Sequence, residues 1–178
     1  MTGAELVRRA AIFQRPERVP YDLPDEYGSD FIWVGMEPDP AWAPPVKGQD
    51  EWGCIWSEPS ELYPRGTVEI CPLVSYDDLD KLKFPDLTIQ GRYARARALI
   101  AGNRQKKFVV ANTRVNYLDR LKLLRGYEEA YSDPLLYPDG CDELLGRLCE
   151  AQMTVVRQFA DMGVDGIFWC DDLGCQDR

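Results

Sequence analysis

The sequence predicts an α/β protein with a parallel sheet, and two apolar runs support this prediction. Residues 107–112 (KFVVAN) are β-branched and nearly all apolar, which is typical of a strand buried on both faces. Residues 164–170 (VDGIFWC) directly follow a long amphipathic helix. From residue 76 the order is therefore helix, strand, helix, helix, strand, as βαβ crossovers produce in a barrel or a doubly wound sheet.

The front of the chain is less regular. Thr2 and Glu5 have the spacing of a capping box, so a short helix is expected to begin there and to end at Pro16. Residues 18–23 (RVPYDL) are a brief strand candidate bounded by prolines. Residues 24–75 are rich in Pro, Trp, Tyr and Gly and are expected to be irregular or hairpin-like. Within them, DEWGCIW alternates as a strand does, and GTVEICPL is its expected partner.

Three further helices are expected in the rear of the chain. After an acidic turn at 77–87, Thr88 is a candidate cap for a helix that stops at Gly102. Residues 117–132 form a second helix, broken near Gly126. The third runs from an N-cap at Asp139 to Gly163, with apolar residues at spacings of three and four. The arginines of the first helix are expected on its solvent side: Arg92, Arg95 and Arg97.

Composition excludes several classes of function. Thirty acidic and 21 basic residues give a net charge of -9, which would repel a phosphate backbone, so no nucleic-acid partner is expected. No stretch approaches the ~20 apolar residues of a membrane span, and the N-terminus lacks the apolar region of a secretory signal. We therefore expect a cytoplasmic protein without a membrane partner.

The six cysteines form no C-x-x-C pair, and the chain contains no histidine. Neither a disulfide framework nor a common zinc site is expected, and the thiols are predicted to be reduced and mostly buried. No cofactor is assigned to this chain on these grounds. The positions concerned are Cys54, Cys71, Cys141, Cys149, Cys170 and Cys175.

Candidate substrate-binding residues follow the predicted strands. Asp171 and Asp172 lie at the carboxyl end of 164–170, where α/β enzymes place their active sites. Either carboxylate could bind a substrate cation, accept a proton or ligate a metal, or else cap a helix. Arg114 follows residues 107–112 and offers a planar fork of donors to a substrate carboxylate, the alternative being a surface arginine.

Glu51 and Trp52 are weaker candidates, because a tryptophan beside acids suits a substrate platform but more often anchors a core or a loop.

Four segments carry a resemblance to a known family. DEWGCIW, PLVSYDDLDKLKFPDL, LLRGYEEAYSDPLLYPD and GVDGIFWCDDLGCQD resemble, in this order, the uroporphyrinogen decarboxylase-like superfamily. The chain is most similar to its branch of corrinoid-dependent methyltransferase-like proteins. The resemblance runs from residues 15–20 to Gln176, and it implies a (β/α)8 TIM barrel. Such a barrel needs about 250 residues, so residues 1–178 are expected to be one partial barrel domain, truncated on its C-terminal side.

The resemblance implies a parent enzyme that moves a methyl group between a corrinoid carrier and a thiol acceptor. A small-molecule substrate and a corrinoid protein would then be its partners. Arg114, Asp171, Asp172 and Gln176 would line the barrel mouth. In that family, a histidine and cysteines from the later half of the barrel bind zinc. This chain contains neither that half nor any histidine, so a zinc site is expected only in the full-length parent.

Three alternatives remain open at this stage. One is uroporphyrinogen decarboxylase, an enzyme of porphyrin biosynthesis, although the arginine-rich signature expected after the first strand is missing. Another is a glycoside hydrolase-type barrel, because such enzymes use two carboxylates that flank the scissile bond. The second acid would have to come from another part of the chain, and Glu51 is the candidate for it. The last is an inactive truncated product.

Overall fold

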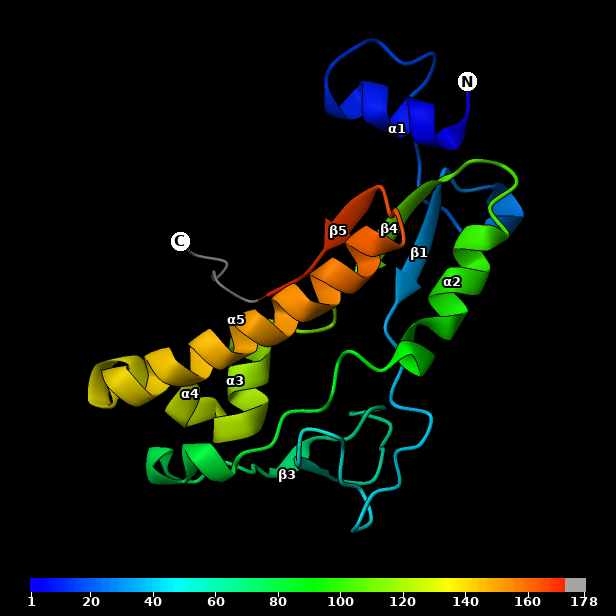
Figure 1. Cartoon of the computed structure of the whole chain (residues 1–178). Helices are drawn as coiled ribbons and strands as arrows, with labels where there is room; N and C mark the ends of the chain where they lie inside the picture. The colour runs from blue at the N-terminus through cyan, green and yellow to red at the C-terminus, as the bar shows by residue number, and fades with distance from the viewer. Residues whose placement is uncertain (172–178) are drawn as a thin grey trace. The chain divides into compact units, whose positions relative to one another are not determined.

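The computed structural model describes residues 1–171 and has a mixed α/β fold with a three-stranded parallel sheet (Figure 1). Contacts divide the chain into two compact units. The first, here called the sheet unit, comprises residues 1–37, 88–114 and 155–169. The second, here called the helical unit, comprises residues 38–87, 115–154 and 170–171.

The sheet unit is built on three parallel strands in the order β1-β4-β5. They are β1 (Phe31–Gly35), β4 (Phe108–Asn112) and β5 (Gly166–Phe168). In register, Trp33 lies opposite Val110, and Asn112 lies opposite Phe168. The predicted strands at 107–112 and 164–170 and their parallel pairing are thus confirmed.

The strand expected at residues 18–23 is wrong, because β1 lies further along the chain, in a region predicted to be irregular. Residues 18–23 are held at the start of β1 by side-chain bonds and by one backbone bond, from the Asp30 N–H to the Tyr21 carbonyl at 3.0 Å, and not by a strand ladder. Arg18 donates two hydrogen bonds of 2.7 Å to the Asp30 carboxylate, which also accepts a bond of 3.0 Å from the Tyr21 backbone N–H. Trp33 Nε1 donates to Asp22 at 2.6 Å.

The two faces of the sheet differ in exposure. Successive side chains of a strand point to opposite faces, so Val34, Val109 and Ala111 share one face, and each is at most 4% exposed. Trp33 and Phe168 share the other face, where their rings meet edge to face with centroids 5.3 Å apart. These two aromatic side chains remain 44% and 40% exposed.

The helices of the sheet unit begin with α1 (Gly3–Ala11), where the predicted capping box is present. Thr2 Oγ1 accepts from the Glu5 N–H, and Glu5 accepts from the Thr2 N–H at 2.8 Å. A short 3-10 helix, η1 (Asp25–Tyr27), precedes β1.

The next helix, α2 (Ala94–Ala101), follows a 3-10 turn, η3 (Gln90–Tyr93), and ends at Gly102 as expected, but Thr88 caps neither of them, so that part of the prediction is wrong. Arg92 was expected in solvent but is 2% exposed, because it lies in the 3-10 turn and donates to the Glu37 carbonyl.

The helical unit contains the predicted hairpin, with β2 (Ile55–Trp56) antiparallel to β3 (Val68–Ile70). The acidic turn forms η2 (Tyr76–Lys81). The helix expected at 117–132 is interrupted at Gly126, as predicted, into α3 (Tyr117–Arg125) and α4 (Tyr127–Leu136).

The longest helix, α5 (Pro138–Asp161), contributes residues to both units and is close to the predicted span, but Asp139, the predicted N-cap, lies in its first turn. Leu144 and Leu148 are fully buried, as are Val155 and Phe159 further along the helix. Within residues 1–171, no helix has the length and apolar character needed to cross a membrane.

Candidate functional site

A small cleft in the sheet unit lies at the carboxyl ends of β1 and β4, where the sequence placed Arg114. Its volume is about 190 Å³. In α/β proteins this edge of a parallel sheet is the usual place for ligands. We call it the Arg114 cleft; its lining includes Trp33, Glu37, Arg95, Asn112 and Arg114.

The backbone at Arg114 is held in an unusual conformation. Its φ is +55°, in the left-handed region that residues other than glycine rarely adopt. Asn112 Oδ1 accepts a hydrogen bond of 3.0 Å from the Arg114 N–H, which supports this turn. The side chain then folds back over β1, where a Cβ on Gly35 would lie 3.4 Å from Arg114 Nε. Backbone strain of this kind gathers at functional sites.

The charges in the Arg114 cleft include a second guanidinium. Arg95 projects from α2 and pairs with the Glu37 carboxylate at 3.5 Å, with 73% of the arginine side chain exposed. Arg114 is exposed as well. Because both arginine side chains are exposed, both guanidiniums are accessible to an anion, although Arg95 is paired with Glu37. The cleft is therefore suited to bind a small molecule that carries carboxylates.

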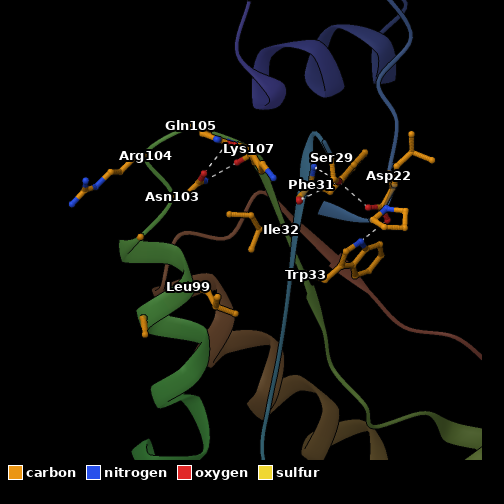
Figure 2. Close-up of a pocket in the computed structure, with 14 residues that line it drawn as sticks. Asp22, Ser29, Phe31, Ile32, Trp33, Leu99, Asn103, Arg104, Gln105 and Lys107 are labelled. Atoms are coloured by element: carbon orange, nitrogen blue, oxygen red, sulfur yellow. Dashed lines mark hydrogen bonds between the residues drawn. The ribbon is translucent and has the colours of Figure 1, made fainter. Parts of the chain in front are cut away.

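A larger cavity of about 780 Å³ lies beside the amino-terminal part of β1 (Figure 2). Asp22 lines one side of the cavity and accepts hydrogen bonds from Ser29 Oγ at 2.9 Å and from Trp33 Nε1 at 2.6 Å. On the opposite side, Asn103 and Lys107 are joined by two hydrogen bonds between the Asn103 amide and the Lys107 backbone. These polar groups stabilise the walls with bonds to one another.

Asp171 lies at the start of α3, in the helical unit. Its Oδ2 accepts from the Leu118 N–H at 2.8 Å, and its Oδ1 accepts from the Asp119 N–H at 3.1 Å. These N–H groups belong to the first turn of α3, which has no side-chain cap from Asn116. The carboxylate therefore stabilises a helix end, which is one of the roles predicted from the sequence. The helix that it caps is α3, which follows β4, and not a helix after β5.

Glu51 and Trp52 lie near the hairpin of the helical unit. Glu51 Oε1 accepts from the Asp39 N–H at 2.6 Å. Trp52 is 7% exposed and packs on Phe84, with ring centroids 5.0 Å apart. Its other ring contact is Arg120, whose guanidinium carbon lies 4.3 Å from the indole centroid.

Two predicted site residues, Asp172 and Gln176, lie outside the described residues. Across residues 1–171, no three His, Cys, Asp or Glu side chains come together in a way that would hold a metal ion. Trp52 and Asp171 both contact α3. Trp52 contacts the Arg120 guanidinium, and Asp171 accepts a hydrogen bond from the first turn of the helix.

Sequence reasoning missed Glu37, Arg95 and Arg120. Glu37 could have been found, since it comes two residues after the apolar run FIWVG. Arg95 was assigned to solvent, and it is indeed exposed, but at the rim of a cleft. Arg120 carries no local signal, because the tryptophan that it contacts lies far away in sequence.

Comparison of the chain with protein families, with curated proteins and with solved structures found no match in any of the three.

Proposed function

We propose that this chain is part of a uroporphyrinogen decarboxylase-like (β/α)8 barrel enzyme that binds a carboxylate-bearing small molecule in the Arg114 cleft. The observation that carries the proposal is the strained Arg114 at the carboxyl end of β4, close to the second guanidinium of Arg95. The four family-like sequence segments support the same assignment.

Three features of the sheet are those that a barrel would have. The parallel strands lie side by side in chain order, as the strands of a barrel do throughout. Val34, Val109 and Ala111 are buried on one face, while the other exposes Trp33 and Phe168, as expected for side chains that further strands would enclose. Within the described residues β1 pairs only with β4, so its other edge is open to a further strand.

The proposed reaction of the parent enzyme is methyl transfer between a corrinoid carrier and a thiol. Zinc bound by such an enzyme lowers the pKa of the thiol and so supplies a thiolate. The described residues of this chain offer no set of ligands for that metal, and we derive no step through it. Arg114 and Arg95 would hold and orient the carboxylates of a reactant at the mouth of the barrel.

Decarboxylation of a tetrapyrrole is the second candidate. The specific observation that favours it is the presence of two guanidiniums in one cleft, because such a substrate carries several acidic side arms. In that reaction arginines would hold the acetate groups while the pyrrole ring changes its charge.

Succinate tests the proposed binding site. Its titration should shift the Nε–Hε signal of Arg114 in ¹H–¹⁵N spectra until the site is saturated. Succinate binding should become about tenfold or more weaker in Arg114→Gln, since a charged hydrogen bond is lost. Arg104→Gln is the matched control, because Arg104 is exposed and lies in the larger cavity. Equal affinity of wild type and Arg114→Gln would rule out the Arg114 cleft as the carboxylate site.

Two further probes separate the candidate reactions. Uroporphyrin binding that depends on Arg114 would favour the decarboxylase. Binding of methylcobalamin, followed by loss of its methyl group to an added thiol, would favour the methyltransferase. Both probes absorb visible light, so binding is followed directly by spectroscopy.

A further inference from the structure

The helical unit contains a guanidinium that is largely enclosed and stacked on an aromatic ring. Arg120 of α3 lies over the Trp52 indole at 4.3 Å from the ring centroid. Trp52 is itself 7% exposed and is held in place by Phe84 on its ring. This contact is a cation–π interaction, which fixes the plane of the guanidinium.

Nothing in the described residues neutralises this cation directly. Arg120 Nε is closed off from solvent and has no hydrogen-bond partner. Within residues 1–171, the two acids that influence its pKa, Asp50 and Asp119, do so through their charge and not through a hydrogen bond to the guanidinium. Burial lowers the pKa of Arg120, which means that the charged form is held at a cost. Enclosed donors normally find a partner.

The nearby acids are occupied elsewhere. Asp50 attracts Arg120 from a distance, but its carboxylate accepts the Trp52 N–H at 2.9 Å, the Cys54 N–H at 3.0 Å and Trp56 Nε1 at 2.9 Å. Asp119 pairs with Lys122 at 2.8 Å. Both carboxylates are therefore engaged by groups other than Arg120.

A polar acceptor on the same helix is also left without a partner. Asn116 Oδ1 is buried and unbonded, and it precedes Arg120 by four residues, which places the two on one side of the start of α3. A donor and an acceptor that both lack partners lie in one region of the helical unit. Such groups are satisfied by a ligand or by water.

We propose that Arg120, backed by Trp52, is a binding site for the carboxylate of a small organic acid, separate from the Arg114 cleft and independent of the function proposed there. A planar carboxylate matches two parallel N–H donors of a guanidinium. A singly charged carboxylate also fits better than a doubly charged phosphate, because Asp50 and Asp119 both lie close enough to influence Arg120.

Trp52 provides a reporter for this site. The whole chain is labelled with 5-fluorotryptophan, and the Trp52 ¹⁹F signal is assigned as the one missing in Trp52→Phe. Sodium acetate is then titrated at constant ionic strength against sodium chloride. The Trp52 signal should shift until the site is saturated with acetate and should not do so with chloride. In Arg120→Met the apparent affinity for acetate should fall about tenfold or more, as expected for loss of a charged hydrogen bond.

Controls keep the test decisive. Arg9→Gln removes an exposed guanidinium from α1 and should leave acetate binding unchanged. Arg120→Lys keeps the charge but loses the planar fork, so it should bind acetate more weakly than wild type. If Arg120→Met does not fold, the wild-type titration still decides the question. A Trp52 signal that moves equally with acetate and with chloride would overturn the proposal, as would saturable binding that survives in Arg120→Lys at wild-type strength.

Discussion

Arg125 and Asp133 form a buried ion pair that joins α3 to α4. Arg125 Nε donates to Asp133 Oδ2 at 2.7 Å, and Nη2 donates to Oδ1 at 3.2 Å. The two side chains are only 5% and 1% exposed. Tyr76 Oη also donates to Asp133 Oδ2 at 2.8 Å, and Arg125 Nη1 donates to the carbonyls of Leu73 and Val74. This network ties the two helices to the first residue of η2 and to the segment before it.

Removing the charge of Asp133 should therefore destabilise the chain strongly. Asp133→Asn is expected to lower the free energy of unfolding by about 3–5 kcal/mol, because it leaves the Arg125 cation buried without its counter-ion. Urea denaturation measures the change. The control is Asp80→Asn, since Asp80 pairs with Arg147 at 2.7 Å but is 95% exposed. That substitution should cost less than about 1 kcal/mol. Similar costs for the two variants would contradict this account of the network.

The same pair predicts a pH dependence. Burial acts to raise the pKa of Asp133, but the hydrogen bonds from Arg125 and Tyr76 outweigh it and lower the pKa overall. The stabilisation is thus complete above the unfolded value of about 3.9 and is lost as pH falls through the lower folded value. The stability difference between wild type and Asp133→Asn should be constant from about pH 5 to 7 and should shrink below about pH 4. Acid titration of both proteins in urea checks this.

Local patterns predicted much of the fold, but burial by distant segments was not predictable. β4 and β5 were found because continuous apolar runs next to helices have few other interpretations. β1 was missed because prolines and aromatic residues surround it and made residues 24–75 look irregular. β1 is aligned by its pairing with β4, far along the chain, and the bond from Arg18 to Asp30 that holds the preceding segment is not evident from the sequence either.

The candidate sites also combine features that the local sequence predicts with contacts between distant segments that it does not predict. Arg114 was placed correctly at the end of β4 because a strand end is a local feature. Its role in binding substrate remains a prediction. The stacking of Arg120 on Trp52 joins residues from separate parts of the chain, so a helical periodicity could not reveal it. Arg92 was misplaced for a related reason, since a 3-10 turn changed the direction expected from an α-helix.

The glycine between α3 and α4 should be intolerant of substitution. Gly126 has φ +119° and ψ 156°, a region that is essentially restricted to glycine. Gly126→Ala is expected to lose about 1–3 kcal/mol of stability. Gly146 in α5 is the matched control, because a Cβ there meets no atom within 4 Å. Gly146→Ala should gain about 0.5–1 kcal/mol through helix propensity. Thermal or urea unfolding that gave both variants the same sign would contradict the assignment.

The thiols should differ in reactivity. Burial is the main cause that raises the pKa of Cys54 to about 12, and its Sγ lies 3.2 Å from the Leu123 carbonyl. Cys149 and Cys170 are exposed and Cys71 is half-buried, so the expectation that the thiols are mostly buried is wrong for the described cysteines. At pH 8, iodoacetamide should therefore label Cys149 and Cys170 long before Cys54, because the thiolate is the nucleophile. Peptide mass spectrometry after timed quenching gives the order, and early labelling of Cys54 in the folded chain would show that its surroundings are open.

The contact between Asp171 and α3 predicts how the start of that helix responds to mutation. Both carboxylate oxygens accept backbone N–H groups, those of Leu118 and Asp119. Asp171→Ala removes both acceptors and should cost about 1 kcal/mol, the usual effect of losing a helix cap. Asp171→Asn keeps one amide oxygen as an acceptor, so its cost should be smaller.

Hydrogen exchange locates this effect more sharply than global stability does. In Asp171→Ala, the amide protons of Leu118 and Asp119 should exchange faster, because these N–H groups lose their acceptor. Those of Leu148 and Val155, within α5, should keep their protection because α5 is bonded internally. Unchanged exchange at Leu118 and Asp119 would mean that Asp171 does not hold the helix end in solution. The carboxylate would then be available for the substrate contact that the sequence first predicted.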